Sequence, residues 1–279
     1  PEGAWPGFKA FMRFCMDIRA RHYEVIADFH GIFKSGLITA FSRADDKYGF
    51  ARPRSQELSY LFTNRKVRLS SERLNRVEEN LALCERIAPS RSRPNVTMFI
   101  PAEVQDDIQE YFDQTFDGGK LTIAVHVPVD REEKRWPDAY FAELCDMLLG
   151  DGRYEVVLTW GPGQLGEVEA VLRKMHRKPR IAPEMPDLKH YACFVHAANL
   201  YFGCDTGPMH IAAIMGTPIV AVFGGTDPAK HAPVNTPCRV LYAEPGKTNG
   251  KLSPAQRLEL ITPEMAYDAC VDLLAKTKG

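Results

Sequence analysis

The stretch LYFGCDTGPMHIAAIMGTPIVAVF, residues 200–223, decides the fold. An apolar strand opens it, an Asp-Thr-Gly turn follows at 205–207, and Pro208 stands where its fixed φ and missing N–H suit the first turn of a helix. Gly216 can take the left-handed conformation just past the end of that helix, and Pro218 cannot continue it. A second apolar strand, IVAVF, comes next. This succession of strand, helix and strand predicts two parallel strands of an α/β sheet.

The same alternation of strands and helices extends back from this stretch to residue 118. Two apolar runs indicate buried strands, LTIAVHV at 121–127 and YEVVLTW at 154–160. Helices are expected at 137–149, between the second run and residue 175, and at 188–198. Strands joined by such crossovers predict a doubly wound parallel sheet over residues 118–279. A last helix, 263–277, is expected to pack back on the first of two domains.

Residues 1–117 predict a separate α/β domain, because Asp-Gly-Gly at 117–119 breaks the composition before the second series begins. The run YEVIADF at 23–29 indicates a buried strand. A helix is expected at 7–22, where apolar side chains recur at steps of three and four residues: Phe8, Phe11, Met12, Cys15 and Ile18. Further helices are expected at 70–87 and 103–112, with a loop at 88–95.

Composition narrows the class of protein. Among 279 residues the formal net charge is −1, which gives no basic field for a nucleic-acid partner. No apolar run reaches the roughly 18 residues of a membrane span, and residues 1–6 lack the pattern of a signal peptide. Seven scattered cysteines without a CxxC pair suit a reducing compartment. We therefore expect a soluble cytoplasmic protein. No pair or cluster of carboxylates and histidines has evident metal-ligand spacing, so no metal site is expected.

The helix that begins near Pro208 predicts a site for a diphosphate. Its free N–H groups and positive dipole end face the crevice at the carboxyl edge of the sheet. Each contact with negative charge there is worth about 0.3 to 2 kcal/mol, so further cations are needed. Lys134, in the motif KRWP, follows the strand at 121–127 and reaches the same edge. On the other interpretation, Asp205 only closes a turn and KRWP is solvated surface.

Several motifs together resemble glycosyltransferase family nine, the lipopolysaccharide heptosyltransferases. They are KRWP at 134–137, LTWGPG at 158–163, DTGPMHIAA at 205–213 and FGGTDP at 223–228, with YEVIADFHGIFKS at 23–35 and YLFTNRK at 60–66 in the first half. The resemblance implies the GT-B type of fold, two Rossmann-like domains that face a central cleft. It also implies an ADP-activated heptose in the C-terminal half and a lipid A core acceptor, or a related glycan or glycolipid, in the N-terminal half.

The resemblance also implies roles for individual residues. The side chain of Lys134 would contact the donor phosphates. Glu167 would replace the glutamate that the family places on the donor ribose, because that position falls near Gln164 or Leu165 here. The residues expected to line the diphosphate and sugar pocket are Asp205, Thr206, Gly207 and His210. Lys34 and Arg54 would contact the acceptor, although either can equally be an ordinary surface cation.

The mechanism implied is a metal-independent transfer that inverts the anomeric carbon and uses no cofactor. The family's catalytic aspartate follows its first strand, and nothing in this sequence matches that strand and loop, so the general base is expected upstream of Pro1 and the N-terminal domain is expected to lack its first strands. Val129 and Asp130 stand where related enzymes carry small hydroxyl residues, and Asp130 would repel a phosphate. Peripheral contact with the inner membrane is expected.

Two other functions fit parts of the sequence. A member of the family without its base would be a non-catalytic nucleotide-binding protein. Gly161, Gly163 and Gly166 form a GxGxxG pattern after the strand at 154–160, which is typical of NAD-dependent dehydrogenases. That pattern normally follows the first strand of its domain, whereas here it follows the second and contains Pro162.

Overall fold

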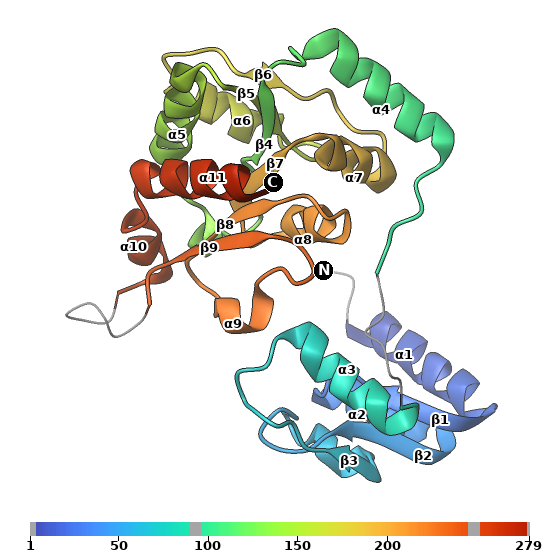
Figure 1. The fold of residues 1–279 in the computed structure, drawn as a ribbon. Coiled ribbons are helices and arrows are strands. Elements are labelled where there is room, and N and C mark those ends of the chain that lie inside the picture. The colour runs from blue at the N-terminus through green and yellow to red at the C-terminus, as the bar shows by residue number, and fades with distance from the viewer. Residues whose placement is uncertain (1–3, 90–95, 245–251, 278–279) are drawn as a thin grey trace. The chain divides into compact units, whose positions relative to one another are not determined.

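The structure, a computed structural model, describes residues 4–89, 96–244 and 252–277 and divides into two compact units, Pro1–Pro94 and Asn95–Gly279 (Figure 1). The division falls earlier than the expected boundary at 117/118, because helix α4 (Ala102–Thr115) packs in the second unit. Its Phe112 ring lies 5.1 Å from that of Phe194 on helix α7 (Leu188–Ala197).

The second unit contains a six-stranded, fully parallel sheet in the order β6-β5-β4-β7-β8-β9. Its strands are β4 (Leu121–His126), β5 (Tyr154–Thr159), β6 (Arg180–Ile181), β7 (Leu200–Cys204), β8 (Ile219–Phe223) and β9 (Cys238–Tyr242). The chain moves from β4 toward one edge of the sheet and then restarts at β7 on the other side of β4. This is the doubly wound order, and its switch point lies between the carboxyl ends of β4 and β7.

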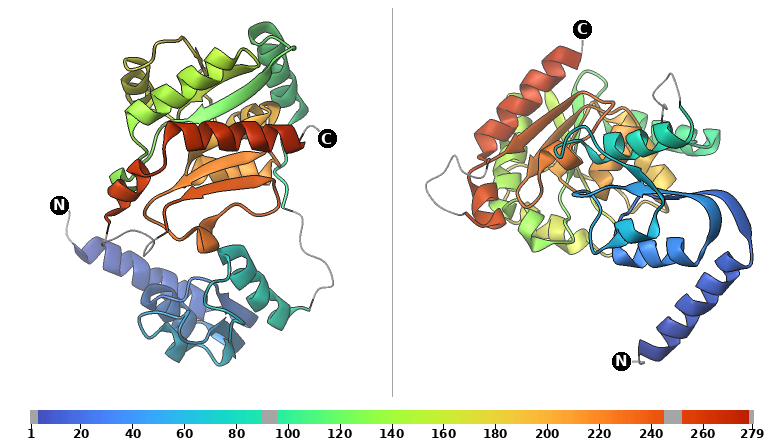
Figure 2. Two further views of the ribbon diagram at one scale, coloured as in Figure 1. Left: turned by 60° about the vertical axis from the view of Figure 1, so that its left-hand side comes forward. Right: turned by 90° about the horizontal axis from the view of Figure 1, so that it is seen from below.

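Helices cover both faces of this sheet (Figure 2). Because successive side chains of a strand point to opposite faces, Ile123 and Val125 belong to one core cluster and Ala124 belongs to the other. The first cluster is covered by α5 (Asp138–Asp151), α6 (Leu165–Leu172) and α11 (Pro263–Thr277), and the second by α4, α7 and α8 (Gly207–Ile214). Helix α11, expected to pack back on the first domain, covers the sheet of its own unit.

Short helices connect these layers at the carboxyl edge. They are η2 (Glu132–Lys134), α9 (Pro228–His231) and α10 (Pro254–Glu259). The buried Trp136, which follows η2, donates its indole N–H to the carbonyl of Ile261, just beyond α10, at 2.9 Å. The loop after β4 is therefore fastened to the C-terminal helices.

The first unit has a parallel sheet of β1 (His22–Asp28), β2 (Arg43–Phe50) and β3 (Arg65–Val67). Its helices are α1 (Ala4–Arg19), α2 (Phe33–Phe41), η1 (Ser59–Phe62) and α3 (Arg76–Ile87). The buried core is small and centres on Phe50, Val67 and Leu83. The α/β class expected for this half is confirmed. Of the loop expected at 88–95, residues 90–95 lie outside the described residues.

Two expectations from composition concern membrane spans and cysteines. Within the part of the chain that the structure describes, no helix is both long and apolar enough to cross a bilayer. All seven cysteines are free thiols, and five of them are buried.

Candidate functional site

The predicted helix start at the carboxyl edge of β7 is confirmed. Helix α8 begins at Gly207 with Thr206 as its N-cap and Pro208 in its first turn, and Gly216 beyond its end has a φ of +77°. The hydroxyl of Thr206 does not cap the helix and donates instead to the carbonyl of Cys204 at 3.4 Å. The first-turn N–H groups therefore have no side-chain cap and remain available for an anion.

Lys134 reaches this helix start, as the sequence predicted. Its ammonium Nζ lies 2.7 Å from Oδ2 of Asp205 and 3.1 Å from the backbone oxygen of the same residue. The Asp205 side chain is only 6% exposed, and that of Lys134 is 19% exposed. The ammonium carries three donors, so one N–H remains for a ligand. The switch point of the sheet thus places a partly buried cation beside the α8 N-terminus.

His210 lies in the first turns of α8 and faces the same carboxylate. Its Nε2 is 3.9 Å from Oδ1 of Asp205, and half of its side chain is exposed. Burial lowers the pKa of His210, the Asp205 carboxylate raises it in part, and the nearby His231 and Lys134 lower it further. The imidazole is therefore a neutral hydrogen-bonding group near pH 7 that an arriving diphosphate would push toward protonation.

Glu167, in the first turn of α6, lies at the rim of this edge but is already paired. Its Oε2 accepts from Nη1 of Arg135 at 2.5 Å and from the backbone N–H of Val129 at 3.3 Å. Arg135 also donates to Asp138 at 2.9 Å. Glu167 can therefore offer its other oxygen, Oε1, to a ligand hydroxyl while Arg135 compensates its charge.

The loop after β5, which carries the GxGxxG pattern, closes on itself and on Asp130. Gln164 accepts from the backbone N–H of Gly161 at 3.1 Å and donates to Oδ1 of Asp130 at 3.2 Å. A Cβ at Gly161 would lie 2.7 Å from Oε1 of Gln164, so a larger residue there would require the Gln164 side chain to shift. A dinucleotide pyrophosphate would bind at the switch point between β4 and β7, whereas this loop follows β5, on the other side of β4.

His126, at the end of β4, is a packing residue. Its Nδ1 lies 3.0 Å from Oγ1 of Thr159 and 3.2 Å from the hydroxyl of Tyr191. Complete burial lowers the pKa of His126 to about 3, so the imidazole stays neutral in the folded protein.

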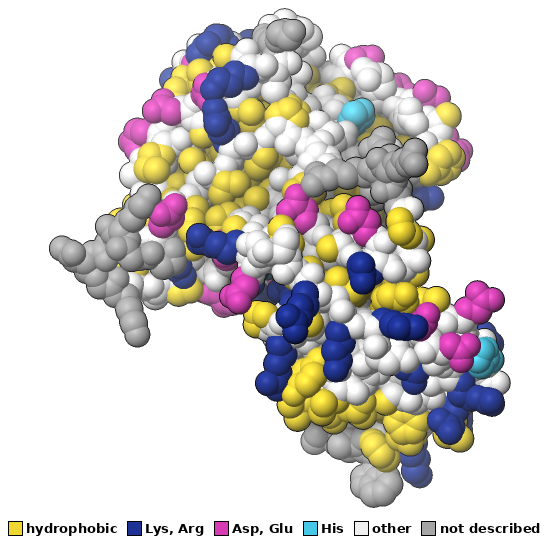
Figure 3. All heavy atoms as spheres, turned by 60° about the horizontal axis from the view of Figure 1, so that its bottom comes forward, with side chains coloured by type: hydrophobic (Ala, Val, Ile, Leu, Met, Phe, Trp, Pro, Cys, Tyr) yellow, Lys and Arg dark blue, Asp and Glu magenta, His cyan; other side chains and the backbone are white. Residues whose placement is uncertain are grey.

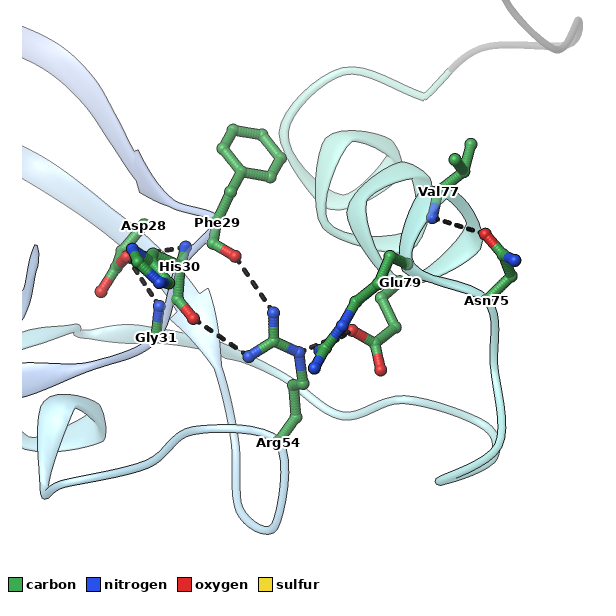
Figure 4. Close-up of polar contacts among 9 residues, drawn as sticks. Asp28, Phe29, His30, Gly31, Arg54, Asn75, Val77 and Glu79 are labelled. Carbon is green, nitrogen blue, oxygen red and sulfur yellow. Dashed lines mark hydrogen bonds and ion pairs between the residues drawn. The ribbon is translucent and has the colours of Figure 1, made fainter. Parts of the chain in front are cut away.

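A polar cluster in the first unit contains Arg54, which was expected to contact the acceptor (Figure 4). The guanidinium donates from Nε to Glu79 at 2.6 Å, from Nη1 to the carbonyl of His30 at 3.0 Å and from Nη2 to the carbonyl of Phe29 at 3.3 Å. Glu79 is almost fully buried, and Asp28 accepts the N–H of Gly31 at 2.9 Å. All three guanidinium nitrogens of Arg54 are thus engaged in fastening the β1–α2 loop to α3.

Lys34 differs from Arg54. It is exposed in the first turn of α2, and among the described residues it has no hydrogen bond or ion pair. Its ammonium is free for a ligand, so an acceptor contact by Lys34 stays a prediction. Across the same described ranges no group of three or more His, Cys, Asp or Glu side chains is placed to hold a metal ion.

One residue of the site, Thr226, was missed by the sequence analysis, whereas Arg135 belongs to the KRWP motif that the sequence had already singled out. Thr226, in the loop after β8, donates from Oγ1 to Oδ2 of Asp205 at 2.5 Å. Arg135 pairs with Glu167 across 32 residues of sequence. The signal for Thr226 was its place in the FGGTDP motif at the end of a buried strand, on the edge that carries Asp205.

Comparisons with known proteins agree with this fold. Glycosyltransferase family 9 (heptosyltransferase) matches residues 11–277. The lipopolysaccharide core heptosyltransferase OpsX of Haemophilus influenzae is 23% identical over 231 residues, which are 82% of this chain and 65% of that protein. Lipopolysaccharide heptosyltransferase 1 of Escherichia coli K12 is 26% identical over 216 residues, 76% of this chain and 64% of that protein. The chain therefore spans less than two thirds of the length of these curated relatives.

Solved structures share the fold. A glycosyltransferase of family 9 from Veillonella parvula superimposes with a TM-score of 0.78 at 22% identity, over 99% of this chain and 80% of that one. The E. coli heptosyltransferase WaaC with ADP superimposes with a TM-score of 0.66 at 22% identity, over 97% and 80% of the two chains. The expected GT-B class, with two Rossmann-like units, is confirmed.

Proposed function

The chain belongs to glycosyltransferase family 9, and on that premise we propose that it transfers a heptose or similar sugar from an ADP-linked donor to a lipopolysaccharide core or related glycan. Relatives named as lipopolysaccharide heptosyltransferases support the sugar and the acceptor class. The relative whose structure is titled as a complex with ADP supports the donor nucleotide. The same membership makes an NAD-dependent dehydrogenase the weaker interpretation.

One observation carries the proposal: Lys134 lies 2.7 Å from Asp205 at the uncapped start of α8, on the switch point of the sheet. A leaving nucleoside diphosphate gains negative charge as its bond to the sugar breaks. Helix N–H groups, one free ammonium N–H and the His210 imidazole supply fixed donors for that charge, as electrostatic catalysis requires.

The same donors support a transfer that needs no metal ion or cofactor, because the charge that a cation would neutralise meets protein groups instead. Inversion at the anomeric carbon requires a base to take the proton of the acceptor hydroxyl. Asp28, the buried carboxylate at the end of β1, accepts two backbone N–H groups and is suited to holding its loop. We assign the role of general base to no residue of this chain.

The first unit supports an anionic acceptor. Residues 1–94 contain 17 Lys and Arg against 11 Asp and Glu, whereas residues 95–279 contain 18 against 25. Figure 3 displays Lys and Arg side chains among hydrophobic ones on the smaller unit. A basic surface of this kind attracts phosphorylated glycolipids and the anionic leaflet of the inner membrane. We place the protein in the cytoplasm, in peripheral contact with that membrane.

Calorimetric titration with ADP, UDP and GDP tests the donor site. ADP should bind the wild-type protein, and Lys134→Met should weaken that binding by tenfold or more, the scale of one lost charge-assisted contact. Lys120→Met is the matched control, because this exposed lysine precedes β4 at the opposite, amino edge of the sheet. Absence of binding by all three nucleotides would refute the proposal.

A transfer assay tests the chemistry separately. Wild-type protein is incubated with ADP-heptose and lipopolysaccharide that lacks core heptose, and the product is followed by mass spectrometry. Sugar transfer supports the enzyme, and retained ADP binding without transfer would indicate a non-catalytic nucleotide-binding protein.

A further inference from the structure

Thr226 connects a third loop of the carboxyl edge to the proposed donor site. This loop follows β8, next to β7 in the sheet, and the Thr226 hydroxyl donates to Oδ2 of Asp205 at 2.5 Å. Lys134 binds the same carboxylate oxygen at 2.7 Å. A hydroxyl and an ammonium therefore converge on one oxygen of a side chain that is only 6% exposed.

Gly224 and Gly225 show which segments lie next to this loop, and only Gly224 makes a close approach. A Cβ on Gly224 would lie 2.4 Å from Cγ of the buried Leu258 on α10, and a Cβ on Gly225 would lie 3.5 Å from the backbone oxygen of Glu133 in η2. The loop is thus held between α10 and the segment that carries Lys134. Since closely packed backbone moves little, the contact of Gly224 with Leu258 limits how far the backbone before Thr226 can move.

We infer that Thr226 is a positioning residue for the donor diphosphate, acting through Asp205 and Lys134. A carboxylate accepts several hydrogen bonds, and an ammonium donates three. With Thr226 on Oδ2, Lys134 bridges that oxygen and the backbone oxygen of Asp205, and its third N–H stays available. Without the hydroxyl, the buried carboxylate loses a charge-assisted hydrogen bond and draws more strongly on the ammonium of Lys134. The third N–H of that ammonium is then less available to a ligand.

The inference rests on the proposed function and is tested by ADP titration of Thr226→Val and Thr226→Ser. Valine keeps the shape and removes the hydroxyl, so ADP affinity should fall by about five- to tenfold. Serine keeps the hydroxyl and should bind within about twofold of wild type. Thr236→Val is the matched control, because that hydroxyl donates to the carbonyl of Thr217 at 2.8 Å elsewhere in the unit.

A double-mutant cycle distinguishes positioning from a general effect on folding. In a Lys134→Met background, Thr226→Val should cause no further loss of ADP affinity, because the ammonium through which it acts is gone. An unchanged affinity in Thr226→Val, an equal loss in both backgrounds, or a failure of serine to restore binding would each overturn the inference and leave the proposed function standing. If the valine variant does not fold, Thr226→Cys, with its weak donor, takes its place with the same expectations. Absence of ADP binding in the wild type would overturn both.

Discussion

Replacement of Lys134 by methionine should cost stability as well as ligand affinity. Methionine keeps the unbranched stem and removes the ammonium, so Asp205, 6% exposed, loses the Lys134 ion pair and keeps the Thr226 hydroxyl and the more distant His210 imidazole. Removing one partner of a buried ion pair costs about 3–5 kcal/mol. Because Lys134 itself is 19% exposed, water can replace part of the contact, and we expect the lower figure, about 3 kcal/mol. For a unit of this size that corresponds to a fall in Tm of about 6–12 °C.

The double variant Lys134→Met with Asp205→Asn separates the two roles. A neutral amide no longer needs a counter-charge, so the double variant should regain most of the lost Tm, yet ADP binding should stay weak because the cation is still missing. Scanning calorimetry measures the Tm of the larger unit, and titration measures the affinity. A Tm of the single variant within 2 °C of wild type would refute the ion-pair argument. A double variant that stays as unstable as the single one would trace the loss to packing of the stem.

Three further predictions concern residues outside the donor site. Because the pKa of His126 is lowered from 6.5 to about 3, only the unfolded chain takes up this proton below pH 6.5, and the group should reduce stability by about 1.4 kcal/mol per pH unit there. Urea titrations between pH 4 and 7 measure how steeply the free energy of unfolding changes with pH. This slope should be smaller in His126→Gln and the same as wild type in the control His176→Gln, whose side chain is exposed. A slope of His126→Gln equal to that of wild type would contradict the assignment. Arg54→Met should destabilise the smaller unit by about 2 kcal/mol because Glu79 keeps only one of its two arginines, as measured by urea unfolding. Lys34→Ala should leave the free energy of unfolding unchanged and raise the KM for the acceptor. If Lys34→Ala instead destabilised the unit and Arg54→Met raised the KM, Arg54 would be the acceptor contact and Lys34 the structural residue.

The central site was predictable because its signals are local and its geometry is general. The turn at 205–207, Pro208 and Gly216 mark the ends of α8 in the sequence itself. All strands of a parallel sheet end on one edge, so Lys134 after β4 and Asp205 after β7 were expected together before any distance was known.

Side-chain partners and the weaker elements were not predictable in this way. Strand β2, RADDKYGF, carries four charged residues and lacks an apolar pattern, yet it is the middle strand of the small sheet. Nothing in the sequence around Arg54 indicated that its guanidinium would form an ion pair with Glu79, 25 residues later. Helix α3 was expected to begin near residue 70 but begins at Arg76. Asn75 caps it, because its side-chain oxygen accepts the backbone N–H of Val77 at 3.0 Å. Helix α4 was assigned to the wrong side of the boundary because its aromatic partner on α7 is distant in sequence.

The indole of Trp136 bonds to a carbonyl 125 residues later in the chain. During synthesis at about 5–20 residues per second, roughly 6 to 25 seconds separate these two positions. The loop that carries Lys134 therefore lacks this hydrogen bond until the segment that contains Ile261 has been synthesised. In a growing chain the proposed donor site would gain this anchor only after residue 261 has been made, and a chain cut short before residue 261 would keep the strands β4 to β9 without it.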